Sequence, residues 1–211
     1  MNDRLRRGQR TARAVVALSS LLCVAQSGLA TVTLAADIPG LLVRRLTMRV
    51  GNQLIGAVST VGFDVTGANT SPTPTPVTGV PSASSAPAAS PANSVRISVS
   101  NRYGIAQGNR VIVTVDSSAG MACSAGPCGS TTIPFSTISW TASSLATGTY
   151  AGQDFGSGSF NGSASQTLLD FSAGAFQNFS IVNDWVFSYS NATLYPAGTY
   201  RGTVRFTATM P

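Results

Sequence analysis

The eleven residues that precede the final proline alternate strictly between two kinds of side chain. One set is apolar or small and the other is Arg or Thr: Tyr200, Gly202, Val204, Phe206, Ala208 and Met210 against Arg201, Thr203, Arg205, Thr207 and Thr209. Successive side chains of a β-strand point to opposite faces, so the pattern predicts one continuous strand with one buried face. We expect Tyr200, Val204 and Phe206 to face the core. The other register would bury Arg201 and Arg205, at a cost on the order of several kcal/mol per unpaired charge.

Shorter runs of the same alternation recur upstream, separated by turn signals and without a helical pattern. They lie at about residues 45–50, 61–65, 95–99, 111–115, 133–142, 165–171 and 185–189. This arrangement predicts an all-β fold, an antiparallel immunoglobulin-like or pilin-like β-sandwich of about eight strands. The turn signal Gly51-Asn52 further predicts a hairpin between the first two runs.

A tract rich in Pro, Ser, Thr and Ala at about residues 68–94 interrupts the strand pattern and holds six of the 11 prolines. Such a composition buries little apolar surface, and its prolines do not fit inside a sheet. It predicts an extended, solvated loop or linker. We therefore expect residues 37–211 to form a single sandwich domain that this segment interrupts.

Residues 1–36 have the pattern of a signal peptide. Five arginines lie within the first 13 residues, and the apolar run Ala14–Ala25 follows them. That run is shorter than the roughly 20 residues that span a bilayer, although a retained anchor is the alternative. Small residues place cleavage after Ala30, Ala35 or Ala36, of which Ala36 is preferred. The pattern predicts a secreted or cell-surface protein with no membrane span after cleavage.

Charge and residue usage restrict the chemistry of the chain. All 13 basic residues are Arg, all 7 acidic residues are Asp, and Lys, Glu and His are absent. Beyond residue 13, 8 Arg face 6 Asp, and no basic cluster stands out along the sequence, so we expect no nucleic-acid partner. Without His or Lys the usual general bases and imidazole ligands are missing. We predict a non-enzymatic protein that uses no cofactor and no metal.

After the leader only Cys123 and Cys128 remain, joined by a small, turn-prone spacer. An oxidising compartment favours a bond between them, which predicts a structural disulfide. Two thiols without His or a second cysteine pair do not complete a tetrahedral metal site.

Trp140 and Trp185 have two interpretations. With Tyr103, Tyr150 and Tyr195 they could form an exposed aromatic platform for a sugar. The alternative is that they belong to the core, because Trp140 is in register with Ile138, and Trp185 with Phe187 and Tyr189.

The segment Tyr195-Pro-Ala-Gly-Thr-Tyr200, followed by alternation to Ala208, resembles the closing strand of secreted bacterial pilin-like β-sandwiches. These include spore-coat-U-type and chaperone–usher fimbrial subunits, and residues 130–140 resemble strand sequence of the same proteins. The resemblance implies a subunit that pairs strand edges with other protein subunits and is assembled with a periplasmic chaperone. Two features depart from it: the Pro-rich tract, and a disulfide loop much shorter than the long-range bridge of many pilins.

These observations predict a secreted, non-enzymatic structural or adhesive surface protein, a pilus-like or coat-like subunit. The alternative is an extracellular carbohydrate-binding module, which would require Trp140 and Trp185 to be exposed.

Overall fold

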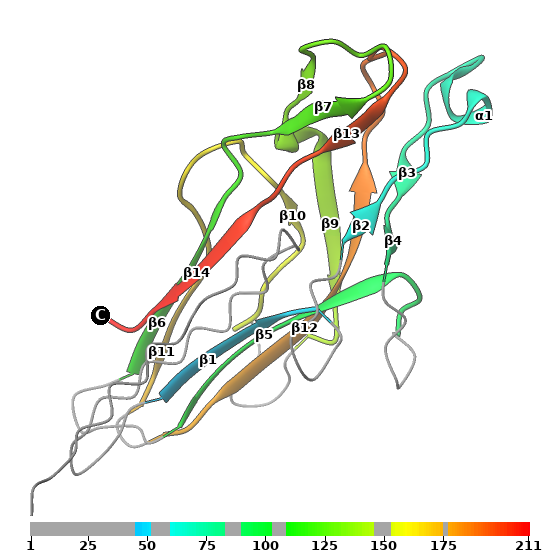
Figure 1. Ribbon diagram of the computed structural model, residues 1–211. Helices are drawn as coiled ribbons and strands as arrows, with labels where there is room; N and C mark the ends of the chain where they lie inside the picture. Colours follow the sequence, from blue (N-terminus) through cyan, green and yellow to red (C-terminus); the bar gives the residue numbers. More distant parts are fainter. Residues whose placement is uncertain (1–44, 52–59, 83–89, 103–108, 146–152, 175–176) are drawn as a thin grey trace, which may run out of the picture.

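The structure is a computed structural model, and it describes residues 45–51, 60–82, 90–102, 109–145, 153–174 and 177–211 (Figure 1). The predicted signal peptide, residues 1–36, lies outside the described residues. Tyr103 and Tyr150, which were considered for an aromatic platform, also lie outside them.

The described residues form β-strands with two short helical turns. The strands are β1 (Arg45–Val50), β2 (Val61–Gly62), β3 (Val77–Thr78), β4 (Val80–Pro81), β5 (Ser94–Arg102), β6 (Asn109–Asp116), β7 (Met121–Ala125), β8 (Thr132–Ile133), β9 (Ile138–Ser143), β10 (Gly158–Ser159), β11 (Gln166–Ala173), β12 (Ser180–Tyr189), β13 (Thr199–Arg201) and β14 (Arg205–Thr209). The helical turns are α1 (Gly67–Thr70) and the 3₁₀ turn η1 (Phe135–Thr137). Of these 14 described strands, eight have five or more residues and six have only two or three.

Most of these strands build two layers, and every pairing among the described strands is antiparallel. One layer has the order β1-β5-β12-β9-β10, with β3 also paired to β12. The other layer has the order β11-β6-β14, and at one end of the molecule the chain continues into the small sheet β13-β7-β8 (Figure 1). The all-β antiparallel sandwich predicted from the sequence is therefore confirmed.

The period-two alternation places the core between the two layers. The central strands contribute Val95, Ile97 and Val99 from β5, and Val111, Val113 and Val115 from β6, all 2% exposed or less. Trp185 on β12 contacts both layers. The centroid of its ring lies 4.3 Å from that of Trp140 in its own sheet and 6.3 Å from that of Phe206 in the opposite sheet. Aromatic side chains thus join the two layers.

The predicted hairpin between the first two runs is not formed. β1 pairs along its whole length with β5, from Arg45 opposite Arg102 to Val50 opposite Ile97, and β2 pairs with β4. Gly51, expected to turn the chain back, donates its N–H to the carbonyl of Arg96 at 2.8 Å and so continues the ladder with β5. The ladder with β5 satisfies the backbone groups on one side of β1, and it places Met48 in the core beside Val99.

The Pro-rich tract is only partly a solvated loop. Residues 71–76 are exposed, as expected, but Val77 is buried on β3, which pairs with β12. Gly79 donates its N–H to the carbonyl of Phe187 at 2.8 Å, and β4 pairs with β2. The expectation of a loop is therefore wrong for residues 77–81. The proline-free pair Val77-Thr78 adds a short strand beside β12, and Pro81 ends the two-residue strand β4, which pairs only with β2 among the described strands.

The C-terminal alternation is also interrupted. β13 and β14 pair with different strands, β7 and β6, and residues 202–204 between them belong to neither. Gly202 passes close to Phe135 and to the backbone of Gly120. A Cβ added at Gly202 would lie 2.7 Å from Cζ of Phe135 and would also clash with the carbonyl oxygen of Gly120. The prediction of one continuous strand is wrong at this crossing, where the chain leaves one sheet for the other.

Candidate interaction edge

The strands β1 and β14 each pair along one side only with the other strands that the structure describes. Within the described part of the chain, β1 pairs only with β5 and β14 only with β6. The two strands belong to different layers and approach each other along one side of the sandwich (Figure 1). We call this side the β1–β14 margin. An edge strand presents a row of N–H and C=O groups to which another strand can bind.

The inward side chains at this margin are only partly buried. Leu46 and Val50 of β1, and Phe206 and Ala208 of β14, pack against the core but keep part of their surface exposed. Val113 of the neighbouring strand β6 is fully buried by contrast. The described residues therefore leave the apolar core incompletely covered beside a free backbone edge.

The predicted core residues of the terminal strand lie along this margin. Tyr200, Val204 and Phe206 are half-buried and pack against the core, whereas Arg201 and Arg205 are exposed. The alternation between faces thus persists through the crossing at residues 202–204. The inward-facing side chains of this segment therefore lie at the edge of the sandwich rather than at its centre.

Asp116, the last residue of β6, lies beside the start of β14. Arg205 lies opposite Asp116 in the ladder. Asp116 accepts hydrogen bonds from the backbone N–H of Ser118 at 3.0 Å and from its hydroxyl at 2.7 Å. These bonds and the nearby Arg205 charge lower the pKa of Asp116, so the carboxylate stays ionised and the turn after β6 is held in place.

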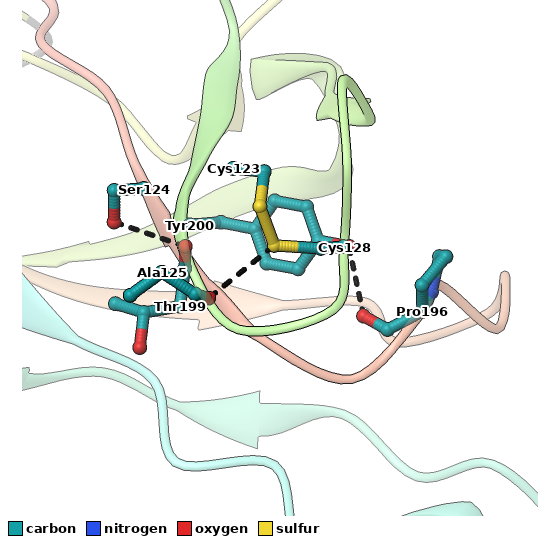
Figure 2. Close-up of a disulfide and its surroundings, with 7 residues drawn as sticks. All are labelled: Cys123, Ser124, Ala125, Cys128, Pro196, Thr199 and Tyr200. Carbon is teal, nitrogen blue, oxygen red and sulfur yellow. Dashed lines mark hydrogen bonds between the residues drawn. A yellow bond between two sulfur atoms is a disulfide. The ribbon is translucent and has the colours of Figure 1, made fainter.

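The disulfide lies beside Thr199 and Tyr200, at the start of β13 (Figure 2). Cys123 and Cys128 are bonded, with 5.7 Å between their Cα atoms. An added Cβ at Gly198 would lie 2.8 Å from Cβ of Cys128, so only glycine permits this approach. Ser124 donates its hydroxyl to the carbonyl of Thr199 at 3.0 Å, and Tyr200 donates its own to the carbonyl of Pro196 at 2.8 Å. The disulfide loop and the turn before β13 therefore pack against each other, and the hydrogen bond between Ser124 and Thr199 joins them.

Trp140 and Trp185 do not form an exposed sugar platform. They are 4% and 0% exposed and stack on each other with an angle of 13° between the rings. Their indole N–H groups are satisfied inside the protein, by the carbonyls of Gly156 at 2.7 Å and Phe155 at 3.0 Å. The interpretation of these residues as core is the one that the structure supports, because the strand register points both rings inward.

The acidic side chains among the described residues do not gather into a metal site. No three His, Cys, Asp or Glu side chains gather there as metal ligands, and no described helix is long and apolar enough to cross a membrane. Two carboxylates are engaged by arginines instead: Asp184 by Arg96, and Asp170 by Arg110.

Comparison of the chain with protein-family models, with curated proteins and with solved structures finds no match. Function must therefore be inferred from the chemistry and geometry of the chain itself.

One half of the margin was not expected from the sequence. The alternation of Leu46, Met48 and Val50 predicts a strand with an apolar face, but the turn signal Gly51-Asn52 favours a hairpin for that strand. The C-terminal alternation gave the two faces of β14 without indicating that it lies at an edge. Only the pairing of β1 with β5 and of β14 with β6 brings the two half-covered strands to the same side.

Proposed function

We propose that this protein is a secreted, non-enzymatic structural or adhesive subunit of a cell surface. It joins other protein chains by adding a strand at the β1–β14 margin. The observation that carries this proposal is the coincidence, among the described residues, of a backbone edge that no other described strand pairs with and half-covered apolar side chains on β1 and β14.

The geometry suits an incoming strand of alternating pattern. Its backbone would bond to the free side of β14, as in other cases of strand addition. Its apolar side chains would point inward, beside Phe206 and Ala208 on one side and Leu46 and Val50 on the other. Burial of apolar surface contributes about 25 cal/mol per Å² removed from water, so this contact would supply affinity in addition to the backbone bonds.

Other features support export to a surface. The disulfide is a bond that oxidising compartments favour, and residues 1–36 have the pattern of a leader. Charged residues make up only 9% of the chain, and the loops at the disulfide end are rich in Ser, Thr, Gly and Pro. An open apolar margin also requires cover before assembly, which agrees with the periplasmic chaperone that the resemblance to pilin-like proteins implies.

The test compares two charge insertions on the same strand. Ala208→Arg places a charge on the inward side of β14, whereas Thr207→Arg places the same charge on its exposed outer side. We expect the parent to associate with increasing concentration in light scattering and to be found at the cell surface. Ala208→Arg should abolish association, and Thr207→Arg should retain it.

Thermal melts of both variants keep this comparison interpretable, since each variant must first be shown to fold. A parent that stays monomeric at every concentration and is never found at the surface of cells would contradict the proposal. Equal association of the two variants would show that the margin is not the contact.

A further inference from the structure

Four arginines gather on the outer face of the β1–β5 pair, half of the eight that follow residue 13. They are Arg45 and Arg49 on β1, and Arg96 and Arg102 on β5. All four are exposed, whereas the residues between them on these strands are partly or fully buried. The sequence concealed this cluster, which we call the arginine face, because its members are spread over residues 45–102.

The strand register sets the spacing of the arginine face. Arg45 lies directly opposite Arg102, and cross-strand neighbours of this kind have Cβ atoms roughly 4.5–5.5 Å apart. Arg49 lies opposite Ser98 and therefore diagonal to Arg96. The two arginine pairs are four residues apart on β1, which is about 13 Å along a strand. Like charges directly opposite each other destabilise a sheet, so folding alone does not account for the pair Arg45–Arg102.

The counter-charge on this face is small. Arg96 donates to Asp184, from Nε to Oδ1 at 2.9 Å and from Nη2 to Oδ2 at 3.0 Å. Among the residues that the structure describes, Arg45, Arg49 and Arg102 form no ion pair. Four Arg and one Asp give this face a charge of +3. The other described charges sum to −1, from three Arg and four Asp: Arg110, Arg201, Arg205, Asp64, Asp116, Asp154 and Asp170.

We propose that the arginine face binds an acidic polysaccharide, with one carboxylate or sulfate group of the chain seated at the pair Arg45–Arg102 and the next one at Arg49, while Arg96 keeps its ion pair with Asp184. Guanidinium groups bind such oxyanions through paired, charge-assisted hydrogen bonds. Thr47, Ser98 and Ser100 lie on the same face between the arginines, and their hydroxyls suit the hydroxyls of a sugar. The outer surface of a sheet also accepts an extended polymer. This site is separate from the β1–β14 margin and does not depend on strand addition.

Two other polyanions fit the arginine face less well. Single-stranded nucleic acid is held largely by stacking of bases on aromatic rings, and the outward residues of β1 and β5 are only Arg, Ser and Thr. Stable attachment to a lipid surface combines basic residues with apolar side chains that insert. The exposed large apolar side chains of the described chain are Val65, Val80, Leu145 and Leu194, and none lies on β1 or β5.

The experiment compares two double variants that each remove two positive charges. Arg45→Gln/Arg102→Gln alters the arginine face, and Arg201→Gln/Arg205→Gln alters two exposed arginines on β13 and β14. Binding to heparin, a sulfated polysaccharide, and to alginate, a carboxylated one, is measured over a range of salt concentrations. We expect the first variant to bind about tenfold more weakly and to show a salt dependence lower by roughly two ionic contacts. The second variant should stay within about twofold of the parent.

Because the two variants retain every other arginine of the chain, any difference between them isolates the arginine face. Equal weakening of both would show that net charge alone is responsible and would overturn the proposal. A parent that binds neither polysaccharide at low salt, or that binds single-stranded DNA or phosphatidylserine vesicles more tightly than both, would overturn it as well. As a folding control, the melting temperature of Arg45→Gln/Arg102→Gln should be no lower than that of the parent, because the change removes a repulsive pair.

Discussion

Strands β6 and β14 are hydrogen-bonded neighbours with the same alternating pattern, yet the sandwich buries them very differently. Val111, Val113 and Val115 of β6 are fully buried, whereas Phe206 and Ala208 of β14 remain half-covered. The cause is position: β6 has β11 on one side and β14 on the other, and β14 pairs only with β6 among the described strands. Alternation therefore determines which face of a strand is apolar, and pairing on both sides determines whether that face is closed.

The same contrast divides the opposite layer. The central strand β12 is buried at most of its positions, and the edge strand β1 buries only Met48. Stability should therefore be concentrated at β5, β12 and β6, and the β1–β14 margin should contribute less to folding than to association. Substitutions at matched positions in the two regions can test this division.

The largest loss of stability is expected at the centre. Trp185→Ala removes a fully buried indole that stacks on Trp140 and contacts Phe155, and it leaves a cavity between the layers. We expect a cost of about 3–5 kcal/mol, measured by urea denaturation. Trp185→Phe, which fills part of that space, should cost clearly less. A loss below that of any margin substitution would show that the centre is not where stability resides.

The next loss is expected at the disulfide end. Replacing Cys123 and Cys128 with Ser opens a loop with a sequence separation of 5 residues. The chain-entropy model gives about 2 kcal/mol for a loop this short. The melting temperature should fall while the β-sheet circular dichroism is retained, because the core of the sandwich lies elsewhere. Two free thiols in protein recovered from outside the cytoplasm would contradict the disulfide itself.

A smaller loss is expected at the margin. Phe206 is only half-buried, so Phe206→Ala should cost the monomer about 1–2 kcal/mol, less than the 3–5 kcal/mol typical of a fully buried ring. Arg205→Ala, one position earlier and exposed, should change stability by under about 0.5 kcal/mol. Chemical denaturation of both variants beside the parent measures the difference. A larger loss for the Arg variant would mean that the assignment of faces on β14 is wrong.

The fold class could be read from the sequence because alternation is a local property. Each strand carries its two faces in its own residues, as residues 95–99 and 111–115 do. The pairing of β1 with β5 could not be predicted in the same way, since a turn signal at Gly51-Asn52 favours a hairpin equally well. The choice between these pairings depends on contacts distant in sequence.

The candidate sites were hidden for the same reason. Nothing in the sequence around Arg45 indicates that Arg102 lies opposite it, because this neighbour is set by register rather than by spacing. The break at Gly202 likewise results from the close passage of Phe135 and Gly120, which no pattern within residues 200–210 reveals. The disulfide could be anticipated because its two cysteines and their spacer are local.

The smallest expected effect concerns two ion pairs that repeat the contrast between centre and edge. Asp184 lies on the central strand β12 with its side chain 3% exposed, and Asp170 lies on the edge strand β11 with its side chain 45% exposed. Burial raises the pKa of Asp184, but hydrogen bonds from Arg96 and Ser144 outweigh this effect and lower it overall. The hydrogen bond from Arg110 lowers the pKa of Asp170.

A carboxyl group whose pKa is lower in the folded protein stabilises the fold above its unfolded pKa, about 4, and this contribution is lost as the pH falls through the folded pKa. The unfolding free energy of the parent should therefore decrease as the pH is lowered from 6 to 2. The decrease should be smaller in Asp184→Asn, by about 1 kcal/mol or less. Asp170→Asn, whose ion pair is open to water, should follow the parent more closely and should lose its remaining difference at high salt. If Asp170→Asn instead flattened the pH dependence of stability more than Asp184→Asn, the edge strand would hold the stronger ion pair. The concentration of stability at the centre of the sandwich would then not apply to its ion pairs.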